Sequence, residues 1–328
     1  MTLKNKSILV TGGAGFIGSH LIDEIVIEDP ENVVVVDNLF LGNDKNLLSA
    51  FREYPNLKIY HNDASKYDEI KKILHSENID VVFDLAVIPL PTSLERPAWT
   101  FRHNTDITLS MCELLREGLY KTLIHFSSSE VYGTSIYAPM DENHPLNGTT
   151  SYAASKAASD LLLLSYCRVY GVDASIIRPF NNYGPRQNEG SYAGVIPITV
   201  NRIIKGEAPI IYGDGNQTRD YLYVTDTAKA ALNIYKSNKT RGRVLNIASG
   251  REVSINHLIH TIAKLMNCTA DVIYGPERPG DVRRHIANIF LSEDLIGFHP
   301  TIGFEEGLKA TIRWYLERRS SSIENNQL

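Results

Sequence analysis

Short apolar runs alternate with longer helix-compatible stretches through the first half of the chain. The apolar runs predict strands, and they read SILVTG, NVVVVD, LKIYHND, IDVVFDLA, KTLIHFSS and DASIIRPFN. NVVVVD has no polar–apolar alternation, which predicts a strand that is buried on both faces. Helix-compatible stretches lie between the runs, at residues 16–27, 67–78 and 104–117. Strands that alternate with helices predict an α/β fold with a doubly wound parallel sheet and right-handed crossovers.

The pattern changes after about Phe180. Proline and glycine become dense in RPFNNYGPRQNEGSYAGVIP, YGDGNQTRDY and GPERPGDVRR, and helical patterns remain at residues 224–235 and 255–266. We therefore expect a first domain over residues 1–180 and a smaller domain over residues 181–320 that contributes ligand-binding loops. Some segments of the second part are expected to return to the first domain. Residues 321–328 are expected to form a frayed polar tail.

The bulk composition is that of a globular enzyme. The chain has 328 residues, with 43% hydrophobic and 22% charged residues. A net charge of -5 argues against nucleic acid or an anionic membrane as the main partner. The three cysteines have no metal-ligand spacing, so we expect no metal site and reduced thiols in a cytoplasmic protein. The first residues lead directly into an apolar strand, so no leader peptide is expected, and no apolar run is long enough to span a membrane.

A glycine-rich turn joins the first predicted strand to the first predicted helix. Gly12, Gly15 and Gly18 have the spacing that lets a backbone turn approach a pyrophosphate at the positive end of a helix. Asp37 ends the second strand, 19 residues after Gly18, where its carboxylate can accept hydrogen bonds from both ribose hydroxyls and would repel a 2′-phosphate. The motif thus predicts NAD rather than NADP, and the alternative is a glycine turn beside a surface aspartate. Asp63 follows the third strand and could reach the adenine edge or equally cap a helix.

A tyrosine and a lysine one helical turn apart provide candidate chemistry. Tyr152 and Lys156 in TSYAASKAASD are four residues apart, on one face of a helix. The lysine ammonium can lower the pKa of the phenol, so that a tyrosinate accepts a proton from a sugar hydroxyl while hydride leaves for a nicotinamide. Alone, this spacing often marks two exposed helix residues, but the glycine motif upstream and the serine-rich strand end before it favour the catalytic interpretation.

With these motifs in this order, the chain resembles the extended short-chain dehydrogenase/reductase family. Within that family it is most similar to the nucleotide-sugar epimerases and dehydratases. The motifs are the glycine turn, SSSEVYG, Tyr152-x-x-x-Lys156, RPFNNYGPR and GDGNQTRDYLYV, and they cover nearly the whole chain. The resemblance implies a Rossmann-type NAD-binding domain, a smaller C-terminal α/β domain for substrate binding, and a nucleotide-sugar substrate.

The resemblance also implies roles for the hydroxyls and the carboxylate in HFSSSEVYG. Ser128 would hydrogen-bond the sugar O4 beside the Tyr152 phenol, and oxidation at C4 would acidify the proton on C5. Glu130 is placed to remove that proton, which a 4,6-dehydratase needs and a simple 4-epimerase does not. The structural alternative is that Glu130 caps or salt-bridges a loop.

One departure bears on the reaction. dTDP-glucose 4,6-dehydratases usually have an aspartate where this chain has Ser129, and that aspartate protonates the leaving C6 hydroxyl. The pair Ser129–Glu130 resembles UDP-glucuronate decarboxylases and some N-acetylglucosamine-nucleotide 4,6-dehydratases, whereas NNYGPRQ, TRDYLYV and RPGDV are more similar to dehydratases and epimerases. We therefore expect a 4,6-dehydratase acting on a nucleotide hexose such as UDP-N-acetylglucosamine. A 4-epimerase, a decarboxylase, a 5-epimerase and a non-catalytic NAD-sensing scaffold stay open.

The resemblance implies two sets of binding residues. The set expected at the cofactor comprises Gly12, Gly15, Phe16, Ile17, Gly18, Asp37, Asn38, Asp63, Ala64, Leu85, Ala86, Asn104, Ser127, Tyr152 and Lys156. The set expected at the nucleotide sugar comprises Ser93, Asn181, Arg186, Val195, Tyr212, Arg219, Arg278 and Arg283. Arg284 is a further candidate, although adjacent arginines are more often a solvated surface. Uracil is the expected base, with guanine and thymine open.

A homodimer is also expected from the resemblance. Residues 104–119 and 151–170 are amphipathic helical patterns with additional apolar surface, notably LLLLSY. In relatives, the equivalent helices form a four-helix bundle between two subunits.

Overall fold

A parallel sheet of seven strands forms the larger part of the computed structural model, which describes residues 1–190, 193–277 and 282–324, with side chains through Arg319. Its strands run in the order β11-β6-β5-β4-β1-β2-β3, and all neighbours are parallel. Their bounds are β1 Ser7–Thr11, β2 Asn32–Val36, β3 Lys58–Tyr60, β4 Val81–Asp84, β5 Thr122–Phe126, β6 Ala174–Pro179 and β11 Val244–Ile247. The strand order reverses beside β1, where doubly wound folds bind their ligands.

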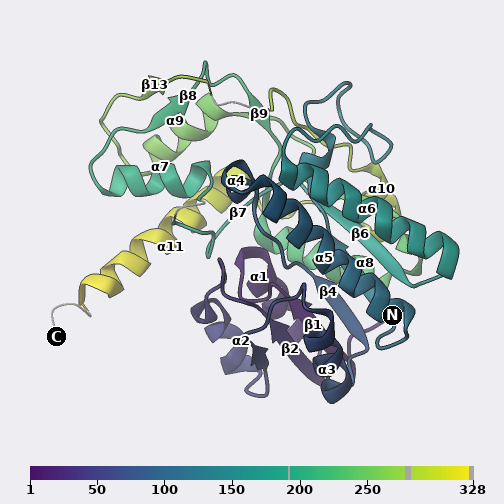
Figure 1. The fold of residues 1–328 in the computed structure, drawn as a ribbon. Coiled ribbons are helices and arrows are strands. Elements are labelled where there is room, and N and C mark those ends of the chain that lie inside the picture. Colours follow the sequence, from purple (N-terminus) through teal and green to yellow (C-terminus); the bar gives the residue numbers. More distant parts are fainter. Residues whose placement is uncertain (191–192, 278–281, 325–328) are drawn as a thin grey trace.

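Helices cover both faces of this sheet (Figure 1). The bounds are α1 Phe16–Val26, α2 Leu48–Glu53, α3 Tyr67–Glu77, α4 Leu90–Glu95, α5 Pro97–Arg116, α6 Ser151–Tyr170, α8 Val224–Lys236 and α10 Phe290–Ile296. One core packs α1, α2 and α8 against one face, and a second core packs α3, α5 and α6 against the other. Because both faces are covered, β1 and β4 are buried along their whole length. The prediction of a doubly wound α/β fold is confirmed.

The second part of the chain divides between the main sheet and a smaller unit. Strand β11 and helix α8 join the main sheet, although both come after residue 180. The smaller unit has its own hydrophobic core, built around α7, α9 and α11. The bounds of its elements are β7 Asn181–Tyr183, α7 Val195–Ile204, β8 Ile210–Tyr212, β9 Thr218–Arg219, β10 Tyr221–Tyr223, β12 Val253–Ser254, α9 Ile255–Leu265, β13 Ile273–Gly275 and α11 Phe304–Glu324.

Two element boundaries differ from expectation. Helix α5 begins at Pro97, seven residues before the expected start, since a proline fits the first helical turn, where its missing N–H has no partner to lose. Helix α11 continues to Glu324, four residues into the expected polar tail. Among the described residues, no helix combines the length and the hydrophobicity needed to cross a membrane.

Candidate active site

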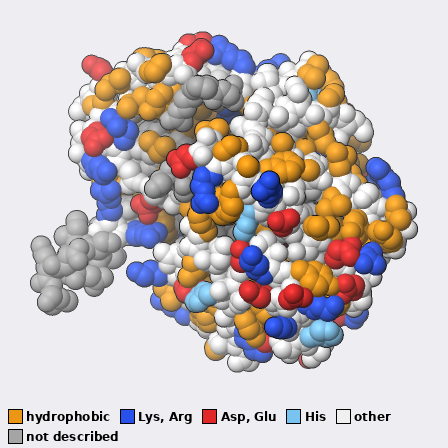
Figure 2. All heavy atoms as spheres, viewed as in Figure 1, with side chains coloured by type: hydrophobic (Ala, Val, Ile, Leu, Met, Phe, Trp, Pro, Cys, Tyr) orange, Lys and Arg blue, Asp and Glu red, His pale blue; other side chains and the backbone are white. Residues whose placement is uncertain are grey.

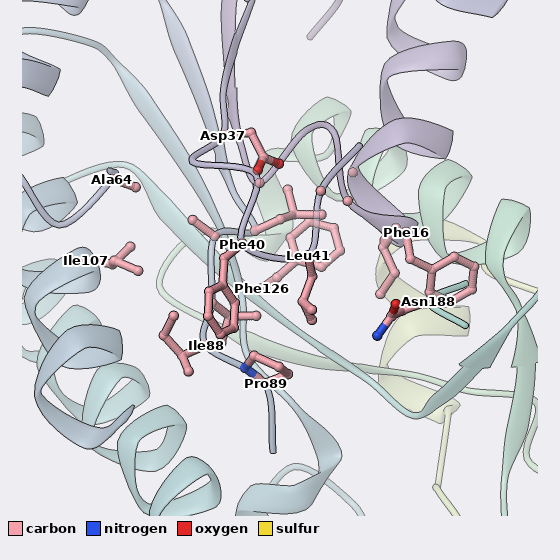
Figure 3. Close-up of a pocket in the computed structure, with 18 of the residues that line it drawn as sticks. Phe16, Asp37, Phe40, Leu41, Ala64, Ile88, Pro89, Ile107, Phe126 and Asn188 are labelled. Carbon is pink, nitrogen blue, oxygen red and sulfur yellow. The ribbon is translucent and has the colours of Figure 1, made fainter. Parts of the chain in front are cut away.

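A cavity opens at the carboxyl ends of β1, β2, β4 and β5 (Figure 3). Asp37 lies at one side of it, the hydrophobic side chains of Ile88 and Phe126 at another, and Asn188 next to Phe16. Most residues expected at the cofactor line this one cavity, namely Gly12, Gly15, Phe16, Ile17, Gly18, Asp37, Asn38, Asp63, Ala64, Leu85, Ala86, Ser127, Tyr152 and Lys156. The cavity is therefore the candidate dinucleotide site.

The turn after β1 has no room for side chains at its glycines. Gly12 has a φ of +65°, and a Cβ there would lie 2.9 Å from the Ala86 nitrogen. A Cβ on Gly18 would lie 2.3 Å from the Gly12 carbonyl oxygen. The turn places the first residues of α1 at the cavity, and no side chain in the described part of the chain caps that helix end. Its N–H groups and positive dipole end suit a pyrophosphate, so the turn fits NAD.

The Asp37 carboxylate is held in place at the end of β2. One oxygen accepts a hydrogen bond from the Leu39 N–H at 2.8 Å, and the other accepts one from the Ala14 N–H at 3.0 Å. Burial raises the pKa of this carboxyl, and the two N–H groups oppose that effect. Asp37 is thus an acceptor fixed by backbone at the cavity wall, as a ribose diol requires.

Two further residues expected at the cofactor show distinct contacts. Asp63 accepts a hydrogen bond from the Ser65 N–H at 2.9 Å and lies 3.3 Å from the ring of His103, while it also lines the cavity. Its capping contact and its place at the cavity are therefore compatible. Asn104 is different, because its amide bonds both backbone groups of Ile88 and the Ser155 hydroxyl. Asn104 braces the loop after β4 rather than lining the cavity.

The serine-rich segment follows directly after β5 and lies at this cavity. Ser127 and Ser128 line it, and within the described chain the buried Ser127 hydroxyl has no hydrogen-bond partner. Ser128 begins the short helix η2 (Ser129–Tyr132), where its hydroxyl accepts a bond from the Glu130 N–H at 3.2 Å. Ser129 is buried, and its carbonyl oxygen lies 3.1 Å from Nε2 of His285. An unpaired buried hydroxyl in a cavity is a group that a ligand can satisfy.

Tyr152 and Lys156 project from the first turns of α6. Thr150 caps this helix by accepting a bond from the Ala153 N–H at 3.1 Å. Burial raises the pKa of the Tyr152 phenol to about 12, a hydrogen bond with Ser128 lowers it, and the Glu130 carboxylate raises it. That Lys156 lowers this pKa stays a prediction. The lysine ammonium lies 3.5 Å from Nε2 of His125.

A second cavity adjoins the first and belongs to the smaller unit. Four residues expected at the nucleotide sugar line it, namely Asn181, Val195, Tyr212 and Arg219. Asn182 and Gln187 line both cavities, so the segment from β7 onward forms a shared wall. The Asn181 amide nitrogen is buried, and the described residues offer it no partner. Its free donor suits a phosphate or base oxygen.

The other residues expected at the nucleotide sugar lie elsewhere. Arg186 lines the first cavity and pairs with Asp23 of α1 at 2.7 Å. Arg283 pairs through both of its terminal nitrogens with Asp214, at 2.9 and 2.7 Å, on a solvent-exposed surface. The Ser93 hydroxyl is used within α4, where it donates to the Leu90 carbonyl. Arg278 lies outside the described residues.

Sequence reasoning missed several residues at the site. Asn182, Gln187 and Asn188 line the first cavity from the second part of the chain. They lie in the segment NNYGPRQN, next to the predicted site residues Asn181 and Arg186, and this proximity in sequence is the signal that could have identified them. Asp84 and His125 were also missed, although they are polar residues within apolar runs, at the carboxyl ends of β4 and β5, which are neighbours in the sheet.

Three known proteins that are similar to this chain are named for three different reactions. It is 38% identical over 308 residues to a putative UDP-glucose 4-epimerase of Methanocaldococcus jannaschii, which covers 94% of this chain and 97% of that protein. It is 33% identical to a UDP-N-acetyl-alpha-D-glucosaminuronate decarboxylase of Bacillus cytotoxicus, covering 98% of this chain and 99% of that one. The crystal structure of DesIV, a dTDP-glucose 4,6-dehydratase of Streptomyces venezuelae with NAD bound, superposes with a TM-score of 0.89 at 29% identity and covers 96% and 98% of the two chains.

The family-level comparison agrees with the geometry of the first cavity. The model of the NAD dependent epimerase/dehydratase family matches residues 8–248, which run from β1 through the end of β11. That stretch contains the glycine turn, Asp37, the serine-rich strand end and the Tyr152–Lys156 pair. The chain belongs to the NAD-dependent epimerase/dehydratase family of nucleotide-sugar enzymes, and its cofactor is NAD.

Proposed function

We propose that this enzyme is a 4,6-dehydratase that oxidises a UDP-hexose such as UDP-N-acetylglucosamine at C4 and then uses Glu130 at C5. The observation that carries the proposal is the position of Glu130. Its carboxylate is close enough to the Tyr152 phenol to raise the pKa of that group. Glu130 therefore lies near the proton acceptor for O4, although it is not among the residues that line either cavity. This arrangement suits a reaction with a second proton transfer after oxidation.

In the oxidation step, Ser128 and Tyr152 hold the C4 hydroxyl of the sugar. The Ser128 hydroxyl is close enough to the Tyr152 phenol to lower its pKa, so a sugar hydroxyl can join this pair at O4. Tyr152 removes the O4 proton, and Ser128 fixes the orientation of the oxygen. NAD, when bound, would supply the acceptor for the C4 hydride, and the hydride would return to C6 after elimination while Glu130, reprotonated from solvent, gives a proton to C5. Burial favours the neutral phenol, so positive charge near Tyr152 is needed before it can act as a base.

In the elimination step, the Glu130 carboxyl group acts first as the base and then as the acid. Glu130 removes the proton from C5, the C5–C6 double bond forms, and the C6–O bond breaks. The same Glu130 carboxyl then donates its proton to the departing C6 hydroxyl, which leaves as water. Ser129 stands where other dehydratases have an aspartate, and it is buried with its carbonyl beside His285. An acid acting from position 129 is therefore not part of this proposal.

A 4-epimerase is the second candidate. The observation in its favour is the 38% identity to the putative UDP-glucose 4-epimerase of M. jannaschii. Such an enzyme would use Ser128 and Tyr152 for C4 oxidation and would return hydride to the opposite face, with Glu130 in a structural role. The relative from B. cytotoxicus is named a decarboxylase, which adds loss of carbon dioxide as a third outcome to be measured.

Product mass separates these reactions. The purified enzyme should be incubated with UDP-N-acetylglucosamine, UDP-glucose, UDP-glucuronate and their GDP and dTDP counterparts, followed by mass spectrometry. The proposal predicts loss of water from a UDP-hexose. An unchanged mass with inverted C4 configuration identifies a 4-epimerase, and loss of carbon dioxide identifies a decarboxylase. No turnover on the whole panel would contradict the proposal and favour a non-catalytic NAD-binding protein.

The second cavity is the proposed site for the nucleoside diphosphate. Asn181, Arg219 and Tyr212 line it, which combines an amide, a cation and an aromatic ring. These are the groups that bind a diphosphate and stack on a base. UDP is the favoured nucleotide, in line with the UDP-sugar names of both sequence relatives.

Cofactor choice depends on Asp37 in this proposal. Replacing Asp37 with alanine should weaken NAD binding by about 10- to 100-fold, since hydrogen bonds to a charged group contribute about 1.5–3 kcal/mol. The preference for NAD over NADP should also narrow, because the charge that repels a 2′-phosphate is lost. Calorimetry on protein freed of cofactor measures both affinities. Asp29→Ala, at an exposed residue that lines neither cavity, is the matched control. Unchanged NAD affinity in Asp37→Ala would contradict this role.

We also infer that the enzyme is a homodimer formed through α5 and α6. These helices pack against each other, and Figure 2 shows hydrophobic side chains gathered on the face that they cover. Exposed hydrophobic residues on these helices include Leu109, Leu161 and Val169, with exposed fractions of 43%, 59% and 71%. Pairing this face with its copy would remove these side chains from water.

Charge on that face should separate the subunits. Leu161→Glu places a carboxylate in the proposed interface, so we expect a monomer at micromolar concentration where the native protein is a dimer. Sedimentation velocity measures the difference. Ile27→Glu is the control, because Ile27 is also an exposed hydrophobic residue but lies after α1. A native protein that is monomeric at micromolar concentration, or a Leu161→Glu variant that stays dimeric, would refute the interface.

A cytoplasmic location completes the proposal. All three cysteines, Cys112, Cys167 and Cys268, are free thiols. Free thiols persist in a reducing compartment, which is the basis of this inference.

A further inference from the structure

We propose that Asp84 and His125 form a buried positioning pair for Lys156, and that the lysine depends on this pair for its place and its charge in the reaction. The pair is one link in a continuous chain of polar contacts. Thr11 donates its hydroxyl proton to one oxygen of Asp84 at 2.7 Å. The other Asp84 oxygen lies 2.8 Å from Nδ1 of His125, and Nε2 of His125 lies 3.5 Å from the Lys156 ammonium.

The sheet register creates this chain from three separate strands. Thr11 is paired with Asp84 across β1 and β4, and Asp84 is paired with His125 across β4 and β5. The three side chains therefore stand side by side at the carboxyl ends of neighbouring parallel strands. Helix α6 crosses above them and brings Lys156 to the end of the row. Strands β4 and β5 hold their residues by backbone hydrogen bonds, so the row has little freedom to shift.

The pair is sealed from water. Asp84 and His125 are each 1% exposed, and Lys156 is 4% exposed. A carboxylate at such a site is stable only with strong partners, and here His125, the Lys156 ammonium and the Thr11 hydroxyl hold the pKa of Asp84 below its usual value despite burial. Asp84 is therefore a fixed negative charge inside the sheet edge.

This charge decides which His125 nitrogen carries the proton. An ionised Asp84 can accept the Nδ1–H of His125, and in this tautomer the Nε2 lone pair faces Lys156. Nε2 can then accept a hydrogen bond from the lysine ammonium. In the other tautomer, a ring N–H and an ammonium would face each other as two donors. The Asp84 carboxylate thus prepares an acceptor for Lys156 through the ring.

Two carboxylates favour the protonated form of Lys156. Burial lowers the pKa of Lys156, and the carboxylates of Asp84 and Asp160 raise it. Asp160 is already paired with Arg178 of β6, at 2.8 Å, whereas within the described ranges no lysine or arginine forms an ion pair with Asp84. Cys112 of α5 and Tyr120, between α5 and β5, also lie near Asp84, but burial raises the pKa of each and both stay neutral.

The consequence for the reaction rests on the proposed C4 oxidation. The buried Tyr152 phenol becomes a base only when positive charge stabilises its anion, and Lys156 is the cation on the same helical face, one turn away. If Asp84 loses its charge, Lys156 loses its proton at a lower pH, and the Tyr152 phenol loses its proton at a higher pH. The pH range in which both groups are in their active form therefore narrows from both sides.

The first test is independent of activity. Nitrogen-15 NMR of the native protein, freed of cofactor, reports which ring nitrogen of each histidine carries a proton, and the His125 signal is assigned by its absence from His125→Gln. The proposal predicts the Nδ1–H tautomer for His125, and it predicts loss of that tautomer in Asp84→Asn, whose amide can donate to Nδ1. A native His125 with its proton on Nε2 would overturn the proposal.

The second test measures cofactor reduction at 340 nm as a function of pH in a single turnover. Asp84→Asn should narrow the active pH range and slow reduction by about tenfold or more at neutral pH, since one pKa unit changes a protonated fraction tenfold. His125→Gln keeps an acceptor near the Nε2 position and should be faster than His125→Asn, which keeps only a group near Nδ1. Asp226→Asn, another buried aspartate, which bonds Thr301 away from the site, controls for folding.

The outcomes separate this inference from the proposed function. If native enzyme reduces no cofactor with any nucleotide sugar, the proposed C4 oxidation is wrong. The tautomer measurement then still tests the Asp84–His125 pair independently. If native enzyme reduces cofactor and Asp84→Asn has the native pH profile, the pair is structural and the inference is wrong. Equal rates for His125→Gln and His125→Asn would also contradict an acceptor at Nε2.

Discussion

Glu130→Gln should still reduce its bound cofactor when substrate is added, yet form product about 10²–10⁴-fold more slowly, the usual effect of losing one positioned base. Glutamine has the shape of glutamate but cannot remove the C5 proton or pass it to the leaving hydroxyl. Reaction should therefore stop at the 4-keto sugar. Absorbance at 340 nm follows the cofactor in a single turnover, and mass spectrometry follows loss of water from the sugar.

Isotope incorporation makes this test sharper. In deuterated solvent, the native enzyme should place deuterium in the product at C5 or C6, and the Glu130→Gln variant should not. Glu293→Gln, at a carboxylate on α10 that lines neither cavity, is the matched control and should behave as native. Native turnover by Glu130→Gln, or product without deuterium, would make Glu130 structural and favour the 4-epimerase.

Tyr152→Phe should block the reaction one step earlier than Glu130→Gln. Without the phenol oxygen nothing accepts the O4 proton, so hydride cannot leave C4 and the bound NAD should stay oxidised. We expect cofactor reduction to slow by about 10²–10⁴-fold. The cofactor content of the purified variant should remain near the native value, since the glycine turn and Asp37 are unchanged.

Two controls accompany this variant. Tyr54→Phe removes a phenol that donates to the Glu31 carbonyl on an exposed surface, and it should leave cofactor reduction unchanged. Ser128→Ala should lie between the native enzyme and Tyr152→Phe, because it removes a hydrogen bond at O4 but keeps the base. Rapid cofactor reduction by Tyr152→Phe would show that another group takes the O4 proton.

The elements that sequence patterns predicted well are those with local signals at both ends. Helix α6 has the expected bounds because Thr150 caps its start and Gly171 ends it in the left-handed conformation. The strands of the main sheet stand out because they are buried on both faces and lack polar interruption. The start of α5 was misplaced because the periodic signal begins well after Pro97, the residue that opens the helix.

The site was less predictable, because side-chain partners depend on register rather than on order in the chain. The glycine turn and Asp37 were predictable, since each is a backbone feature at a strand end. Several contacts join residues that are distant in sequence. They are the hydrogen bonds of the Asn104 amide, the Arg186–Asp23 pair and the Asp84–His125 contact. No spacing rule along one strand gives a contact that forms across two.

If the two cavities bind the dinucleotide and the nucleotide sugar as proposed, their shared wall would link the occupancy of one to the occupancy of the other. Asn182 and Gln187 present atoms to both spaces, and the same segment reaches α1 through Arg186. Any shift of these side chains when a nucleotide sugar enters changes the contacts available to the dinucleotide. Thermodynamic linkage then requires that each ligand alters the affinity of the other by the same factor. A dissociation constant measured for one ligand alone would therefore differ from the constant that applies when the other ligand is also bound.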